Sequence, residues 1–234
     1  SGLQIASLPW RFWDARGYLR EFGDWLNQLL EGYDPTNTLR ARALTVYAFS
    51  IIQQGNSSEG IKLAEQSLQL ARTLSDKQTE AFSLSFLGVF TLVQGRVGES
   101  IPLLEESLAL YKKLGDKIGQ ADVMGYLSIN NSNLKRAIAY AREGLELYRE
   151  LGNLSGIASS LNGLARLTYF GGDLSSPVPW LEETLTISRQ LNDHHNEAEA
   201  LLILGNLAHW QGAYGQANTY YQEAIVLSEK TWNQ

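Results

Sequence analysis

The 234-residue sequence contains no cysteine, which excludes disulfide bonds, thiolate catalysis and thiolate metal sites. Positive charge is also scarce: the formal net charge is -6 and the pI is about 5.2, which argues against direct nucleic-acid binding. No apolar run approaches the roughly 20 residues of a membrane span, and residues 1–4 lack signal-peptide character. These absences favour a cytoplasmic protein that binds neither membrane nor nucleic acid directly.

Motifs of catalysis are missing as well. There is no Walker-type loop ending in Gly-Lys-Ser/Thr, no Gly-x-Ser-x-Gly elbow and no His-Glu-x-x-His helix. The carboxylate pairs Glu105-Glu106 and Glu182-Glu183 recur at one repeat position, which is typical of a solvated helix face rather than of acid–base catalysis. We therefore expect a protein that is not an enzyme and that needs no cofactor.

Two of the three histidines are adjacent, at His194 and His195, directly after Asp193. One interpretation is a metal site, since Asp and two His side chains can serve as ligands. The other is a solvated helix start, because neighbouring residues on a helix point about 100° apart. The second interpretation is favoured, and no metal is expected.

The dominant feature that is present is an internal repeat. Five segments of similar pattern, the first being Leu68-Gln-Leu-Ala-Arg-Thr-Leu74, end at residues 74, 114, 151, 191 and 231. Turn pairs such as Gly115-Asp116 follow four of them, and a second break such as Gln94-Gly95-Arg96 lies about twenty residues before them. Each unit therefore consists of a helix, a tight turn, a second helix and a short turn.

Hydrophobic spacing predicts helices rather than strands. Leu84, Leu87, Gly88 and Thr91 fall at i, i+3, i+4 and i+7, and no stretch shows sustained alternation. The pattern predicts six helix pairs, with first helices over 4–15, 37–54, 77–94, 117–130, 155–170 and 194–211 and second helices over 19–30, 57–74, 97–114, 134–151, 175–191 and 214–230.

Small residues recur where helices of a pair should approach closely. The column in the first helices consists of Ala48, Gly88, Ser128, Ala165 and Gly205. Since glycine inside a helix costs roughly 0.5–1 kcal/mol against alanine, close packing at Gly88 and Gly205 is the expected compensation. The turn glycines suit left-handed helix ends, and Asp76, Asp116 and Asp193 suit N-caps.

The fourth unit departs from the pattern, because residues 126–134 replace the longer stretch 86–97 of the unit before it. Its first helix should be nearly one turn short, with a local kink or gap. Asn130, Asn131 and Ser132 lie at that place and predict a tight turn.

The column pattern resembles the tetratricopeptide repeat. The matching elements are Leu84-x-x-Leu87-Gly88, then Gly95, Ser100 and Ser107-Leu108, although the unit has about 40 residues rather than 34. The resemblance implies an all-α, right-handed superhelical solenoid of about six helix pairs. We expect one domain over 1–234, with a divergent helix pair in 1–35 and five repeats in 36–234, taken from a longer protein.

The opening segment, from Trp10 through Trp13 and Arg16-Gly17 to Trp25-Leu26, is similar to the first unit of one group of such proteins. These are bacterial signal-transduction NTPases and transcriptional regulators that include the maltose-regulon activator, in which a nucleotide-binding module and a winged-helix segment precede the repeats. The resemblance implies a module for effector sensing or protein docking in signal transduction. A passive docking scaffold with no sensing role is the alternative.

The resemblance also implies that the first helices line a concave groove. Aromatic residues beside Asn and Arg suit a protein or peptide ligand, or a small effector such as a sugar. Some first-helix positions, such as Phe86, Ile129 and Leu202, could instead pack against the next unit. The expected ligand-binding residues are Arg42, Phe49, Phe82, Tyr126, Asn162, Arg166, Tyr169, Asn206, His209 and Trp210.

Overall fold

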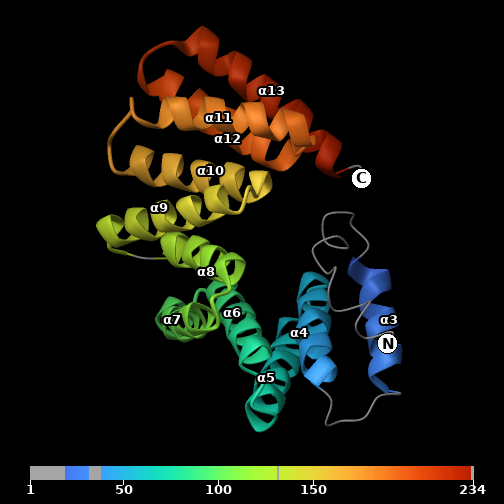
Figure 1. Cartoon of the computed structure of the whole chain (residues 1–234). Helices are drawn as coiled ribbons and strands as arrows, with labels where there is room; N and C mark the ends of the chain where they lie inside the picture. Colours follow the sequence, from blue (N-terminus) through green and yellow to red (C-terminus); the bar gives the residue numbers. More distant parts are fainter. Residues whose placement is uncertain (1–18, 32–37, 131, 233–234) are drawn as a thin grey trace. The chain divides into compact units, whose positions relative to one another are not determined.

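The computed structural model of the protein describes residues 19–31, 38–130 and 132–232, and these ranges are helical with short turns and contain no strand. The helices form sequential antiparallel pairs of the tetratricopeptide type (Figure 1). They are α3 (Leu19–Glu31), α4 (Thr38–Gln53), α5 (Ser57–Thr73), α6 (Lys77–Val93), α7 (Val97–Leu114), α8 (Lys117–Asn130), α9 (Leu134–Glu150), α10 (Leu154–Phe170), α11 (Pro177–Leu191), α12 (His194–Trp210) and α13 (Tyr214–Trp232). Each begins and ends within two residues of its predicted bounds, which confirms the helix assignment, while the helix predicted over 4–15 lies outside the described residues.

The chain divides into two compact units, residues 1–119 and 120–234. In the first unit, α3 places Leu26 and Leu30 against Val46 of α4 and Phe82 of α6. In the second, Leu181 of α11 joins residues of α10 and α12 in a buried cluster. Burial of such side chains contributes about 1.5–3 kcal/mol each. No helix in the described ranges combines the length and hydrophobicity needed to cross a lipid bilayer.

Predicted capping residues hold the turns between pairs. The side chains of Asp76, Asp116 and Asp193 each accept a hydrogen bond from the amide three residues later, at 3.1, 2.9 and 3.0 Å. Gly95 and Gly212 have φ of 76° and 78°, the left-handed conformation that glycine adopts without steric cost. Both predictions are confirmed.

The close approach predicted at two helical glycines is confirmed. A Cβ on Gly88 would lie 2.7 Å from Leu104, and one on Gly205 would lie 2.5 Å from Tyr221. The short first helix of the fourth unit is confirmed too, because α8 has 14 residues where α6, α10 and α12 have 17. The turn predicted next to it includes Asn131, which lies outside the described residues.

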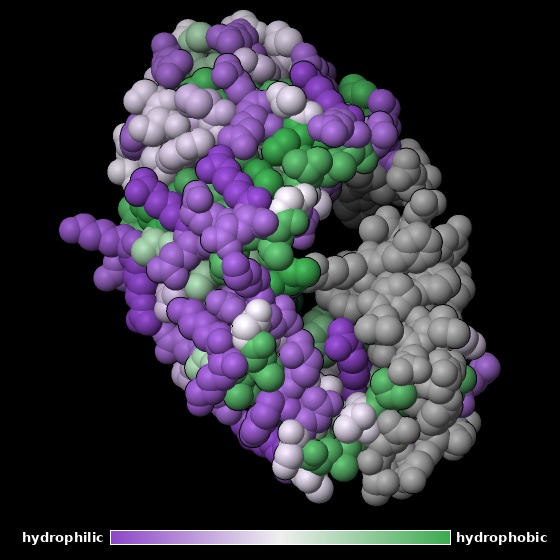
Figure 2. All heavy atoms as spheres, viewed as in Figure 1, coloured by the Kyte–Doolittle hydropathy of each residue, from purple (hydrophilic) through white to green (hydrophobic). Residues whose placement is uncertain are grey.

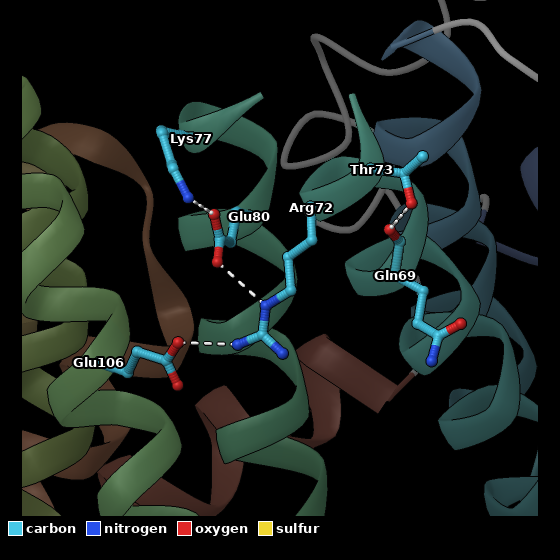
Figure 3. A network of polar contacts seen from close by, with 6 residues as sticks. All are labelled: Gln69, Arg72, Thr73, Lys77, Glu80 and Glu106. Carbon is cyan, nitrogen blue, oxygen red and sulfur yellow. Dashed lines mark hydrogen bonds and ion pairs between the residues drawn. The ribbon is translucent and has the colours of Figure 1, made fainter. Parts of the chain in front are cut away.

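Ion pairs join three of the second helices, α5, α9 and α11, to the pair that follows each of them. In the first unit, Arg72 of α5 meets Glu80 of α6 at 3.0 Å and Glu106 of α7 at 2.7 Å, and Lys77 meets Glu80 at 2.6 Å (Figure 3). Burial raises the pKa of the Glu80 carboxyl, but hydrogen bonds from Lys77 and Arg72 outweigh this effect and hold its pKa below the ordinary value of 4.5.

The second unit repeats this arrangement. Arg149 of α9 meets Glu183 of α11 at 3.1 Å, and Arg189 of α11 meets Glu197 of α12 at 2.8 Å. One repeat position therefore supplies the arginine, and the next pair of helices supplies the carboxylate. These charged residues of the second helices thus form ion pairs between successive repeats.

Contacts between successive pairs are asymmetric. The first helices pack against each other, α4 against α6 and α10 against α12, whereas no two second helices in the described ranges pack to a similar extent. Closer packing on one side bends a stack toward that side. Within each unit, the first helices therefore lie on the inner side of the bend, where the sequence analysis placed the candidate residues.

Candidate functional site

The first helices of the second unit, α10 and α12, lie side by side and present the largest group of candidate residues; we call this surface the α10–α12 face. Polar contacts cross between the two helices along it. They join Asn162 to Asn196 and Glu199, Arg166 to Glu199, and Tyr169 to Trp210. The face thus runs from a buried amide near the start of the helices to exposed aromatic rings at their ends.

Asn162 marks the buried end of the α10–α12 face. It is fully buried, and its Nδ2 donates to the backbone oxygen of Asn196 at 3.0 Å. Its Oδ1 makes no hydrogen bond to any residue that the structure describes. The side chain fixes α10 against the start of α12 and is covered by protein.

Arg166 and Glu199 form the middle of the face. Arg166 Nη1 donates to Glu199 Oε1 at 2.5 Å, and the two side chains are 37% and 27% exposed. The remaining guanidinium N–H groups make no hydrogen bond within the described part of the chain. Because an arginine presents five donors in a planar fork, most of its capacity remains for a ligand.

Asn206 adds donors to the same face. Tyr221 of α13 donates its hydroxyl to Asn206 Oδ1 at 2.9 Å, which occupies the amide oxygen and fixes the amide orientation. The two Nδ2 hydrogens have no acceptor among the described residues. The α10–α12 face therefore offers a ligand more hydrogen-bond donors than acceptors.

Aromatic residues gather at the carboxyl ends of α10 and α12. Trp210 Nε1 donates to Tyr169 Oη at 2.7 Å, and the rings of Tyr169 and Phe170 lie 5.3 Å apart. His209 meets Tyr214 edge to face at 5.3 Å. Phe170 and Trp210 remain 73% and 69% exposed, which is unusual for side chains of this size. The rings provide apolar contact area next to the donors.

The candidate residues of the first unit form a different kind of cluster. Phe82 is buried, with the guanidinium of Arg42 4.9 Å above its ring. Phe49 packs edge to face on Phe86 at 5.7 Å, and Phe86 lies against both Phe82 and Phe90. These rings join α4 to α6, so they contribute mainly to packing.

The remaining candidate, Tyr126, lies on α8 and is half-buried. The structure also adds a residue that the sequence did not single out. Tyr214 follows the turn Gln211-Gly212-Ala213, which folds the start of α13 back onto the end of α12 and brings Tyr214 to His209. The position of Tyr214 directly after a glycine turn was the sequence feature that could have predicted this contact.

In Figure 2, hydrophilic residues dominate the face in view, and hydrophobic residues form smaller groups between them. Against such a surface, exposed aromatic rings beside arginine and asparagine are the composition expected of a recognition site.

The fold defines the chain as a tetratricopeptide-like helical repeat protein. No family model matches the sequence, and no curated protein matches it. The class therefore rests on the structure and on its similarity to solved structures.

Three solved structures illustrate this similarity. A Rap protein in complex with competence and sporulation factor has a TM-score of 0.78 and 16% identity, over 97% of this chain and 65% of that one. A STAND-type signal transduction ATPase with a tetratricopeptide repeat sensor, from Pyrococcus horikoshii, has a TM-score of 0.75 and 14% identity, over 95% of this chain and 33% of that one. BtubC from P. vanneervenii has a TM-score of 0.74 and 18% identity, over 100% of this chain and 94% of that one. At these identities the likeness establishes the fold alone.

Proposed function

We propose that this repeat array is a non-catalytic binding module that receives an extended peptide segment on the α10–α12 face. The observation that carries the proposal is the surplus of donors on Arg166 and Asn206 beside exposed aromatic rings. An extended peptide offers a backbone carbonyl at every residue, together with side chains that can lie on Phe170 and Trp210. The ligand is therefore rich in acceptors and carries apolar or aromatic side chains.

The proposed context is a cytoplasmic, multidomain signalling or transcription-regulating protein of bacteria, in which the array senses its ligand. Three observations support this context: the opening sequence, the likeness to a STAND ATPase with a tetratricopeptide repeat sensor, and the likeness to a Rap protein solved with competence and sporulation factor. In a solenoid each repeat contacts only its neighbours, so a ligand that bridges α10 and α12 can change the angle between their repeats. More specifically, we propose that the protein belongs to the group that includes the maltose-regulon activator.

The binding site is tested with peptides selected from a random display library against the whole chain. Truncation of a charged hydrogen-bonding group costs about 1.5–3 kcal/mol, so Arg166→Ala should raise Kd by about 10- to 100-fold, and Asn206→Ala should raise it less. Arg142, exposed on the second helix α9, is the matched control, and Arg142→Ala should leave Kd unchanged. Peptides that bind all three variants equally would place recognition elsewhere.

A passive docking scaffold and a sensor differ in what binding changes. Hydrogen exchange with and without a selected peptide separates them. A sensor should show altered protection at the α11–α12 and α12–α13 turns as well as on the face itself, whereas a scaffold should show protection limited to contacted residues. A small effector, tested by thermal shift with a panel of sugars, is the remaining candidate ligand.

A further inference from the structure

The acceptors of the α10–α12 face are already used within the protein, whereas several of its donors are not. Glu199 accepts from Arg166 through Oε1 and from Asn162 through Oε2, and Asn206 Oδ1 accepts from Tyr221. A peptide N–H group buried on this face would therefore stay unpaired or compete for an occupied acceptor, and an unpaired buried donor is costly. Proline is the residue that offers a backbone carbonyl without an N–H group. The hydrogen-bond balance of the face thus favours a ligand whose contacting residues are prolines.

Aromatic rings lie beside these donors on both helices. Phe170 ends α10 and Trp210 ends α12, and both side chains are exposed. Tyr169 connects them, because its ring lies 5.3 Å from that of Phe170 and its hydroxyl accepts from Trp210 Nε1. Proline-rich segments dock on surfaces lined by aromatic rings, where a chain that is already rigid loses little conformational entropy.

The spacing of the two helices selects the conformation of the ligand. Packed helices lie about 8–10 Å apart, and α10 packs against α12. Phe170 and Trp210 each end their helix, so their rings repeat at about this distance, and Arg166 and Asn206 repeat in the same way one helical turn earlier. In a polyproline II helix every third residue points the same way, about 9 Å further along. Residues on one side of a β-strand are only about 7 Å apart.

We infer that the ligand of the α10–α12 face is a proline-rich segment of a partner protein in the polyproline II conformation. Carbonyl groups of the segment accept from Arg166 and Asn206. Prolines three positions apart lie on Phe170 and Trp210. This inference rests on the proposed function and specifies the class of its ligand.

The probes are two fluorescently labelled decapeptides, one of L-proline and one of D-proline. Both lack peptide N–H groups and carry the same rings, but the D-peptide forms the mirror image of the left-handed polyproline II helix. It cannot place its carbonyl groups on the donors and its rings on the aromatic residues together. Fluorescence anisotropy with the whole chain should show the L-peptide binding about tenfold more tightly or better, the effect of one lost hydrogen bond to a charged group.

Variants place the binding on this face. Arg166→Ala and Trp210→Ala should each raise the Kd of the L-peptide by about tenfold or more. Trp210→Phe should keep most of the affinity, because it retains a ring and the indole N–H is already bonded to Tyr169. Val93→Ala is the matched control, since Val93 is the exposed last residue of α6 in the other unit, and it should leave the Kd unchanged.

Equal affinity of the L- and D-peptides would overturn the inference, and so would a Kd for the L-peptide that Trp210→Ala leaves unchanged. The L-peptide could also fail to bind while peptides from the display library bind in an Arg166-dependent manner. That result would overturn the polyproline II ligand and leave the proposed function standing. Failure of both kinds of peptide to bind this face would overturn both.

Discussion

Tyrosine and glycine are paired by size across the junctions between repeats. A Cβ on Gly156 would lie 2.4 Å from the ring of Tyr148, and one on Gly119 would lie 2.5 Å from the ring of Tyr111. Both tyrosines are buried, and Tyr148 also donates its hydroxyl to Asp122. The glycines are therefore required by the volume of the ring, although their backbone is ordinary helix.

At the other junctions between repeats, different residues occupy the same two positions. Where the second helix has Ala71 or Ser188 in place of tyrosine, the first helix has Thr79 or Asn196 in place of glycine. The summed volume of the two side chains therefore changes less from repeat to repeat than the volume of either side chain alone. This complementarity within a single chain indicates that the two positions contact each other in every repeat.

Gly156→Thr is accordingly expected to lower the free energy of unfolding by about 1–3 kcal/mol through overpacking. The double variant Gly156→Thr with Tyr148→Ala has the same pair of residues as Ala71 and Thr79. It should lose less unfolding free energy than the sum of the losses of the two single variants. The expected coupling is about 0.5–3 kcal/mol, measured in a double-mutant cycle by urea denaturation. Additive effects would show that the two positions do not share one space.

At the scale of elements, the helices and their turns were predictable because their signals are local. Hydrophobic spacing, glycine turns and aspartate caps each lie within a few residues of the feature they specify. The fourth repeat is 37 residues long where the others have 40, and this difference predicted the short α8. The repetition of each signal across units removed the ambiguity that any one segment would have.

The burial and the hydrogen-bond partner of each candidate residue in the site were less predictable. The resemblance placed Asn162, Phe82 and Arg166 on first helices, but burial depends on which neighbouring side chain reaches over them. Asn162 is covered because α12 lies against it, whereas Leu202, at the same position one repeat later, is 44% exposed. The Arg166–Glu199 pair likewise depends on the offset between α10 and α12, because the two residues are 33 positions apart in sequence.

The Arg72–Glu80–Lys77 network predicts how the α5–α6 junction responds to pH. The pKa of Glu80 is lower in the folded protein than its ordinary value, so its ionised form contributes stability at neutral pH. That contribution is present above about pH 4.5 and is lost as the pH falls through the folded-state pKa. Because Arg72 and Lys77 are half-exposed, solvent screening limits it to about 1–2 kcal/mol.

Glu80→Gln should therefore be less stable than the unmodified chain by about 1–2 kcal/mol at pH 7, and the difference should shrink below pH 4.5. Urea denaturation at pH 7 and pH 3 measures it. Glu99→Gln, which removes a more exposed pair with Arg96, is the control and should change stability by less than about 0.5 kcal/mol. A difference that persists at pH 3 would show that Glu80 acts through packing rather than charge.

At the scale of the whole molecule, the helices within each of the two units pack mainly against their neighbours in the chain. The contacts within the first unit join α3 to α4, α4 to α5, α5 to α6 and α6 to α7, and those within the second follow the same order from α9 to α13. In the described ranges, smaller contacts also join successive first helices, α4 to α6 and α10 to α12. Stability in such an array is close to a sum of repeat terms and neighbour terms.

Leu201→Ala provides the test of this additivity. Leu201 is buried in α12, so its truncation should cost about 2–5 kcal/mol by leaving a cavity. Because stability is local, native-state hydrogen exchange should become faster in α10 to α13 and change little in α4 to α6. Leu84→Ala, at a fully buried residue of α6, should have the reciprocal effect. Uniform acceleration from either substitution would mean that the chain unfolds as one cooperative unit, and a ligand that bends one junction would then be sensed along the entire array.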